Sequence, residues 1–161
     1  MTSDTIELVE RVRRRLSDDS QCRIAGPAQE AAISAAEEAL GCIFPPSYRT
    51  FLSTFGGIAI PHHLGVVHDF VGMENDDVVH RTLRAREERK LGENLVVVGL
   101  GADQQEWFVI DFSRESPGGE NPILLFDARD NALDQVFYED FGQMLNEVMG
   151  FVAESLDQPL D

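Results

Sequence analysis

The stretch PPSYRTFLSTFGG, residues 45–57, decides the fold. Proline is favourable at the start of a helix and cannot continue a preceding one, so Pro45 and Pro46 mark a helix start. Four large apolar side chains then recur at i, i+3, i+4 and i+7, namely Tyr48, Phe51, Leu52 and Phe55. Gly56 and Gly57 end the pattern. We therefore expect a helix with one face buried in a core.

Two further helices are expected before this stretch. Residues 4–16 carry apolar side chains at helical spacing, and a run of arginines crowds the last turn, where cations complement the helix dipole. Pro27 suits the first turn of a second helix, which runs to Leu40. Gly41 follows as its expected C-terminal stop.

The length of 161 residues fits one domain, or one domain with a decorated end. A chain of this size buries about two thirds of its unfolded surface, so it needs no disulfide or structural metal. We divide it into an N-terminal helix and linker extension, residues 1–24, and a single α+β domain, residues 25–155. Cys22 and Cys42 have no CxxC spacing and are expected to be free thiols in a reducing compartment.

The hydrophobic period changes after residue 94. Three apolar runs predict strands: Leu95–Val98, Trp107–Asp111 and Ile123–Phe126. Their short links favour antiparallel neighbours, and residues 139–153 return to a helical stripe. This order indicates an α+β fold with a central, mostly antiparallel sheet packed against several helices, which cover one face.

The region between the third helix and the strands carries the histidines. An extended segment is expected around residues 66–71, and Asn75-Asp76 can cap a helix through about Lys90. Four histidines lie among several acids: His62, His63, His68 and His80. Their spacing matches neither HExxH nor a zinc finger, so we interpret them as loop histidines, with a metal site between His62 and His80 as the alternative.

The charge is unusual and unevenly distributed. The net charge is −16; residues 1–90 carry 11 basic and 14 acidic side chains, whereas residues 91–161 carry 2 basic and 15 acidic ones. Nucleic acid and anionic membranes are therefore poor candidate partners. A positively charged protein would be attracted, although acidity that serves only solubility explains the composition equally well.

The chain is expected to act in the cytoplasm. Asp4, Glu7 and Glu10 stand where a signal peptide needs a basic start and an apolar run. The longest apolar stretch, Leu95 to Ala102, is far shorter than a membrane span.

The sequence offers no specific catalytic group. Gly99 and Gly101 begin a dinucleotide-loop pattern, but the third glycine would fall at Gln104 and no helix follows, so a turn between strands is expected. Nothing matches GxSxG. We predict a protein that is not an enzyme and binds no cofactor.

Trp107 has two open interpretations. If Phe108 and Ile110 face the core, then Trp107, Val109 and Asp111 point the other way. An exposed tryptophan beside acidic groups is typical of an interface anchor. A second layer covering that face of the sheet is the alternative.

Several segments follow the order of a known family. They are Leu40-Gly41, Pro45 to Arg49, Phe51-Leu52, Gly56-Gly57, Leu95–Gly99, Phe108–Asp111 and Pro122–Asp127, with Phe137 and Phe141. The first four resemble the LGxxLPxxYxxFLxxxGG signature of the SUKH superfamily, the Smi/Knr-type domains, and the rest are similar to its strands and closing helix. The resemblance covers about residues 25–150. It implies an α+β fold and no catalytic residues.

The resemblance also implies a function. Bacterial members are immunity proteins that neutralise a polymorphic toxin, often a nuclease, whereas fungal members regulate cell-wall assembly and signalling. Because a nuclease needs a basic cleft, our first hypothesis is an immunity protein with an acidic, phosphate-like surface. The predicted partner-binding residues are Asp103, Glu106, Trp107, Asp127 and Asp130. The alternatives are a regulatory or scaffold module for an endogenous protein and an enzyme that uses the histidines.

Overall fold

The computed structural model describes residues 1–61, 67–73, 77–101 and 105–157. Along the chain these form α1 (Ser3–Arg15), β1 (Arg23–Ile24), α2 (Glu30–Leu40), α3 (Pro46–Thr54), β2 (Ile58–Ala59), β3 (Val67–Phe70), α4 (Val78–Glu88), β4 (Leu95–Gly101), β5 (Glu106–Asp111), η2 (Pro117–Gly119), β6 (Ile123–Asp127), β7 (Ala132–Tyr138) and α5 (Phe141–Asp157). The helix and strand order is that of an α+β fold, as predicted.

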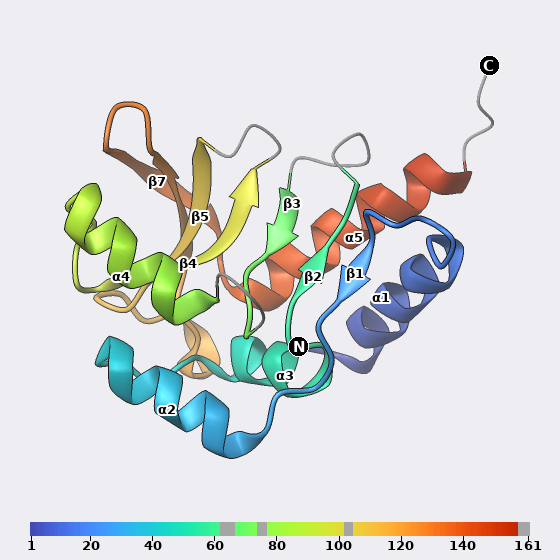
Figure 1. Ribbon diagram of the computed structural model, residues 1–161, viewed down its shortest axis with the longest axis horizontal. Helices are drawn as coiled ribbons and strands as arrows, with labels where there is room; N and C mark the ends of the chain where they lie inside the picture. The colour runs from blue at the N-terminus through green and yellow to red at the C-terminus, as the bar shows by residue number, and fades with distance from the viewer. Residues whose placement is uncertain (62–66, 74–76, 102–104, 158–161) are drawn as a thin grey trace.

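The strands form one antiparallel meander (Figure 1). In the part of the chain that the structure describes, seven strands lie in the order β1 to β7, and each pairs with the next in the chain. The three predicted strands are confirmed as the adjacent strands β4, β5 and β6. β1 and β7 are the two edges of the sheet.

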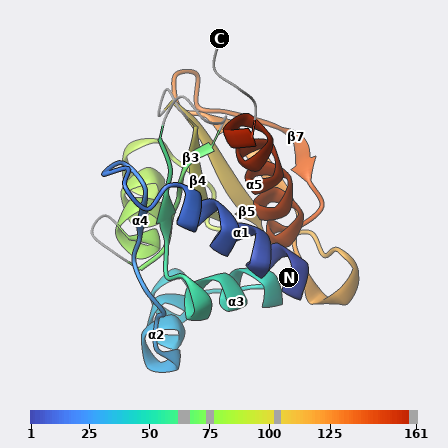
Figure 2. The same ribbon diagram turned by 90° about the vertical axis from the view of Figure 1, so that its right-hand side faces the viewer.

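Helices cover both faces of this sheet, which corrects the expectation of one covered face. α4 packs on β4 from one side, and α5 lies on the other side with α1 against it (Figures 1 and 2). Every residue of β4 is buried. On β5, Val109 and Asp111 are buried as well as Phe108 and Ile110, so the alternation of this strand separates two covered faces.

The predicted helix of residues 45–57 is confirmed as α3, and its apolar face forms the centre of the core. Tyr48, Phe51, Leu52 and Phe55 are all fully buried. The rings of Phe51 and Phe141 lie 4.9 Å apart, which joins α3 to α5. The buried hydroxyl of Tyr48 donates to the Val71 carbonyl at 2.6 Å. Its only polar atom is therefore satisfied inside the core.

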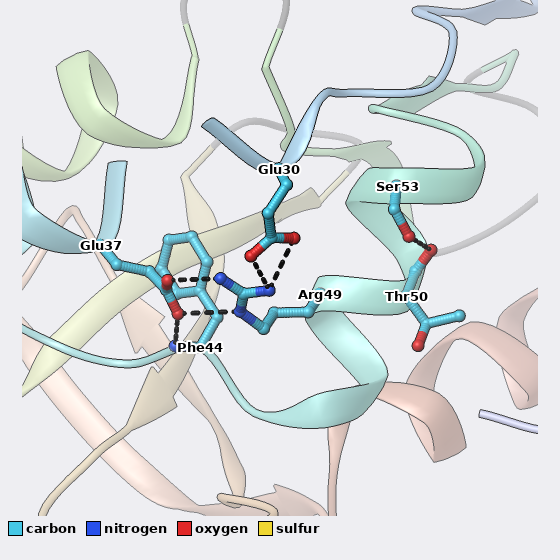
Figure 3. Close-up of polar contacts among 6 residues, drawn as sticks. All are labelled: Glu30, Glu37, Phe44, Arg49, Thr50 and Ser53. Atoms are coloured by element: carbon cyan, nitrogen blue, oxygen red, sulfur yellow. Dashed lines mark hydrogen bonds and ion pairs between the residues drawn. The ribbon is translucent and has the colours of Figure 1, made fainter. Parts of the chain in front are cut away.

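A polar cluster joins α2 to α3 (Figure 3). The Arg49 guanidinium donates to both oxygens of Glu37, at 3.1 Å from Nε and 2.7 Å from Nη2, and lies 2.8 Å from Glu30. Glu37 also accepts the Phe44 N–H at 2.7 Å. Hydrogen bonds from Arg49 lower the pKa of Glu37 against the opposing effect of burial. This cluster fixes the turn between the two helices.

Two glycines allow the backbone to pack tightly beyond α3. Gly56 has φ of +75°, and its carbonyl accepts the Met73 N–H at 2.7 Å. A Cβ on Gly72 would lie 1.7 Å from that carbonyl oxygen. Only glycine fits such an approach.

Some local predictions are wrong in detail. Pro27 precedes α2, which begins at Glu30, because the neighbouring Gly26 and Ala28 amides bond instead to carbonyls at the end of α3. The residue that caps α4 is Asp77, whose carboxylate accepts the His80 N–H. Asn75 and Asp76 lie outside the described residues.

The glycines of the rejected dinucleotide loop also differ from expectation. Gly99 and Gly101 lie within β4, not in a turn. A Cβ on Gly99 would lie 3.2 Å from the Cβ of Phe108 on the neighbouring strand. The glycine therefore serves close strand packing beside a register shift.

α1 confirms the predicted N-terminal helix and joins the common core. Val9, Val12 and Leu16 are buried in it, and the Thr5 hydroxyl donates to Asn146 on α5 at 3.1 Å. The division into an extension, residues 1–24, and a domain, residues 25–155, stays a prediction. Both cysteines are free thiols, as expected.

Candidate functional site

Three of the predicted partner-binding acids lie at one end of the sheet. Glu106 opens β5 and pairs with Asp127, the last residue of β6. Asp130 is exposed in the turn that leads from β6 into β7. Asp103 lies outside the described residues, so its position relative to these acids stays a prediction.

Arg129 offsets part of the charge at this end. Like charges directly opposite each other on neighbouring strands destabilise a sheet, and Glu106 faces Asp127 in register. The Arg129 guanidinium contacts both oxygens of Asp127 at 3.2 Å, and its backbone N–H donates to the same carboxylate at 2.9 Å. These bonds lower the pKa of Asp127, which is therefore ionised at neutral pH. Among the residues described at this end of the sheet, Arg129 is one cation beside the carboxylates of Glu106, Asp127 and Asp130, so the end remains acidic.

Trp107 lies beside these acids and is half-buried. Its ring stacks on Phe126 with the centroids 5.5 Å apart. The second-layer interpretation is confirmed for its neighbours Val109 and Asp111, which are buried. Trp107 itself keeps part of its surface exposed at the end of the sheet.

β7 presents apolar side chains that the sequence analysis missed. Six of its seven residues are exposed, and three of these are large and apolar: Leu133, Val136 and Phe137, at 46 %, 42 % and 52 % exposure. We call Leu133, Asp134, Val136 and Phe137 the β7 edge. The signal for it in the sequence is the β-prone run from Val136 to Tyr138 after the turn residues Asp130-Asn131.

The register places the β7 edge next to Trp107. Residues paired across neighbouring strands share a face, so Trp107, Phe126 and Leu133 form one row across three strands. Val109, Leu124 and Val136 form a second row on that face. Each row runs from buried residues to an exposed one at the edge.

Phe137 exposes apolar surface on the opposite face. Two register shifts interrupt the pairing of β6 with β7, and Phe137 is the residue skipped between Val136 and Tyr138. Its ring lies 5.7 Å from that of Phe108. This is the face of α5, because Phe108 is in register with Gly99 and Phe70, and the Phe70 ring lies 6.2 Å from that of Phe141 on α5. The edge is thus apolar on both faces.

The histidine region gives no metal centre in the described residues. His62 and His63 lie outside them, and the side chain of His68 is not described either. The His80 ring bonds through Nδ1 to Asp77 at 2.9 Å, beside the cap of α4. Among the residues that the structure covers, no group of three His, Cys, Asp or Glu side chains could hold a metal ion.

A small cavity lies beside β1, β2 and β3. It has a volume of about 190 Å³ and is lined by Arg23, Asp69 and Arg81 together with Ala25 and residues 57–59 and 70–72. Pockets for small molecules usually hold about 300–1,000 Å³. Because this cavity is smaller and carries charges of both signs, it is a weaker candidate than the edge of the sheet.

Comparison with known protein families identifies the family of the chain. A model of the SMI1 / KNR4 family (SUKH-1) matches residues 27–147, well over half of the chain. The match runs from just before α2 into α5 and includes β2 to β7. No curated protein matches the chain. None of the helices that the structure describes is long and apolar enough to cross a bilayer.

Proposed function

The chain belongs to the SMI1 / KNR4 family (SUKH-1), and on that premise we propose that it is an immunity protein. In this proposal it is a non-catalytic protein that binds a cognate toxin with a basic surface, in the cytoplasm of the cell that makes both. The observation that carries the proposal is the exposed apolar β7 edge next to Trp107 and the acids Glu106 and Asp127. Apolar anchors surrounded by charge are typical of protein interfaces.

The acids support a specific way of blocking a toxin. A toxin that cuts nucleic acid binds phosphate with lysines and arginines, and carboxylates on a rigid sheet can occupy the same cations. The half of the chain that contains this surface has 15 acidic and 2 basic residues. Its field attracts a basic partner before contact and raises the rate of association.

The burial of the family signature supports a binding role without catalysis. Tyr48, Phe51 and Leu52 are fully buried, and Arg49 is bonded to Glu37 and Glu30. These residues are used to build the core and to join α2 to α3. The side chains that define the motif are thus used by the fold and supply no free nucleophile or base.

Co-expression tests the proposal. The toxin would be the C-terminal domain of a large secreted protein encoded next to the gene for this chain. We expect its expression alone to stop growth and co-expression of the chain to restore growth. The variant Glu106→Gln/Asp130→Asn should restore growth less well. The control Glu38→Gln/Glu88→Gln removes two exposed acids from α2 and α4 and should protect fully.

Two results would contradict the proposal. One is a chain that binds no product of a neighbouring gene and whose deletion leaves cells insensitive to neighbouring strains; that would favour the regulatory module. The other is turnover of a small molecule by the purified chain, abolished by one substitution. Equal protection by both double variants would reject the acidic surface while leaving an immunity role in place.

A further inference from the structure

We propose that β7 accepts an extended segment of the partner as an additional strand of the sheet, and that this segment alternates cationic and apolar residues. The existence of a natural partner rests on the proposed function. The acceptor edge and the chemistry of the segment rest on the structure.

The two edges of the sheet differ in their capacity to pair. Edge strands are usually protected by being short or by carrying proline or lysine. β1 is two residues long and contains Arg23. β7 is seven residues long and contains no proline, lysine or arginine. Among the strands described, β7 is thus the long edge without these protections. The protections that it does carry are two register shifts and the charge of Asp134, which admit a cationic segment more readily than a neutral or acidic one.

Exposed apolar side chains lie on both faces of β7. Leu133 and Val136 end two apolar rows on the Trp107 face, and Phe137 is exposed on the α5 face. A strand added beside β7 would extend both rows and bury these three side chains. An alternating strand has one apolar face, so its apolar residues would contact Leu133 and Val136, since cross-strand neighbours share a face. Its cationic residues would lie on the other face, where their aliphatic stems would cover Phe137.

The charge of β7 selects a cationic segment. Asp134 lies within the strand, and its carboxylate accepts the backbone N–H of Gln135 at 2.8 Å. Between residues 127 and 140 there are five acidic side chains and one basic one, Arg129. A lysine or arginine of the added strand would pair with Asp134 and release the Gln135 N–H to a backbone carbonyl of the partner.

The same charge disfavours a second copy of this chain as the occupant. Antiparallel pairing of two β7 strands about their middle residue, Gln135, would bring both Asp134 carboxylates into the same short ladder. Each copy also carries a net charge of −16. Like charges that close destabilise a sheet pairing, so a basic partner is favoured over self-association.

A pair of defined peptides tests the edge directly. The probes are the capped heptapeptides Lys-Val-Lys-Val-Lys-Val-Lys and Glu-Val-Glu-Val-Glu-Val-Glu, added to the intact ¹⁵N-labelled chain. We expect the cationic peptide to slow hydrogen exchange of β7 amides at least fivefold and the acidic peptide to leave them unchanged. Equal effects of both peptides, or protection only outside β7, would overturn the proposal.

Substitutions separate this edge from general stickiness. Leu133→Lys/Val136→Lys places two cations on exposed positions of β7. It should lower the affinity for the cationic peptide at least tenfold. If the double variant unfolds at a lower temperature than the unmodified chain, Val136→Lys alone replaces it in the peptide-binding test. Ile43→Lys is the control, because Ile43 is 79 % exposed in the link between α2 and α3; it should bind as the unmodified chain does.

Growth assays distinguish the edge from the proposed function. If the peptide protects β7 but the chain fails against its candidate toxin, the immunity role fails and the edge stands. If the chain protects cells and Leu133→Lys/Val136→Lys protects equally well, the immunity role stands and the edge proposal is wrong.

Discussion

The substitution Glu37→Gln tests whether the charged cluster that joins α2 to α3 serves stability. The carboxylate of Glu37 is only 11 % exposed and accepts three hydrogen bonds, from the Phe44 N–H and from two nitrogens of Arg49. A bond to a charged group contributes about 1.5–3 kcal/mol net and a neutral one about 0.5–1.5 kcal/mol. Glutamine keeps the shape but presents an NH₂ group to one donor, so one bond is lost and two are weakened.

We therefore expect Glu37→Gln to lower the free energy of unfolding by about 2–3 kcal/mol at neutral pH. For a chain of this size that corresponds to a fall in Tm of very roughly 4–12 °C. Urea denaturation followed by circular dichroism measures it. The control is Glu38→Gln, the exposed neighbour on the same helix, which should change stability by less than about 0.5 kcal/mol.

The pH dependence provides the decisive comparison. The pKa of Glu37 is lowered from its ordinary value of 4.5, so its contribution is complete above that value and is lost as pH falls through the lowered one. The stability difference between the native chain and Glu37→Gln should therefore shrink as the pH is lowered from 4.5 through the lowered pKa. A difference that stays constant over this range would refute the charge as its cause.

Three further outcomes are expected. Association with a basic partner should slow at least about tenfold between about 50 and 500 mM salt, measured by stopped flow, and an unchanged rate would reject electrostatic steering. Gly72→Ala should lower the free energy of unfolding by about 3 kcal/mol or more, because its Cβ meets the Gly56 carbonyl. Gly150→Ala has open space in α5 and should raise the free energy of unfolding by about 0.5–1 kcal/mol. Similar effects of both substitutions would refute the close approach of Gly72 to Gly56. Burial raises the pKa of Cys42 to about 11, so its alkylation should be slow near pH 7 and rise about tenfold per pH unit; fast reaction at pH 7 would contradict this.

The helix α3 and strands β4 to β6 could be predicted because burial leaves a period in the sequence. Tyr48, Phe51 and Leu52 repeat at helical spacing because one side of α3 faces the core. The run of β-branched residues in β4 marks a strand that is buried on both faces. In these elements apolar residues occupy the buried positions, so the spacing of apolar residues is sufficient to predict the helix and the strands.

The cover on the second face of the sheet could not be predicted from the same kind of pattern. Asp111 marks its side of β5 as polar, yet it is buried. Burial alone would raise the pKa of Asp111, and hydrogen bonds from Ser113 and Asn94 outweigh that effect and lower it. The sequence does not distinguish a buried carboxylate that is fully hydrogen-bonded from one that is exposed to water.

The candidate site was predicted in its charge but not in its geometry. The sequence contains Glu106 and Asp127 without the strand register that pairs them. β7 was missed because its two register shifts break the alternation expected of a strand. Residue type alone also does not distinguish the exposed Leu133 and Phe137 of β7 from core residues.

Under the proposed function, stability and partner choice rest on different residues of this fold. The signature residues of α3 and the Glu37–Arg49 cluster are buried or bonded within the chain, so changing them costs folding free energy. Leu133, Val136 and Asp130 are exposed, and changes there cost little stability while altering what the edge can bind. If the proposed function is right, substitutions in the β7 edge can adapt the protein to a changed toxin sequence without altering its core. Inhibition should then fail in edge variants whose unfolding curves are unchanged.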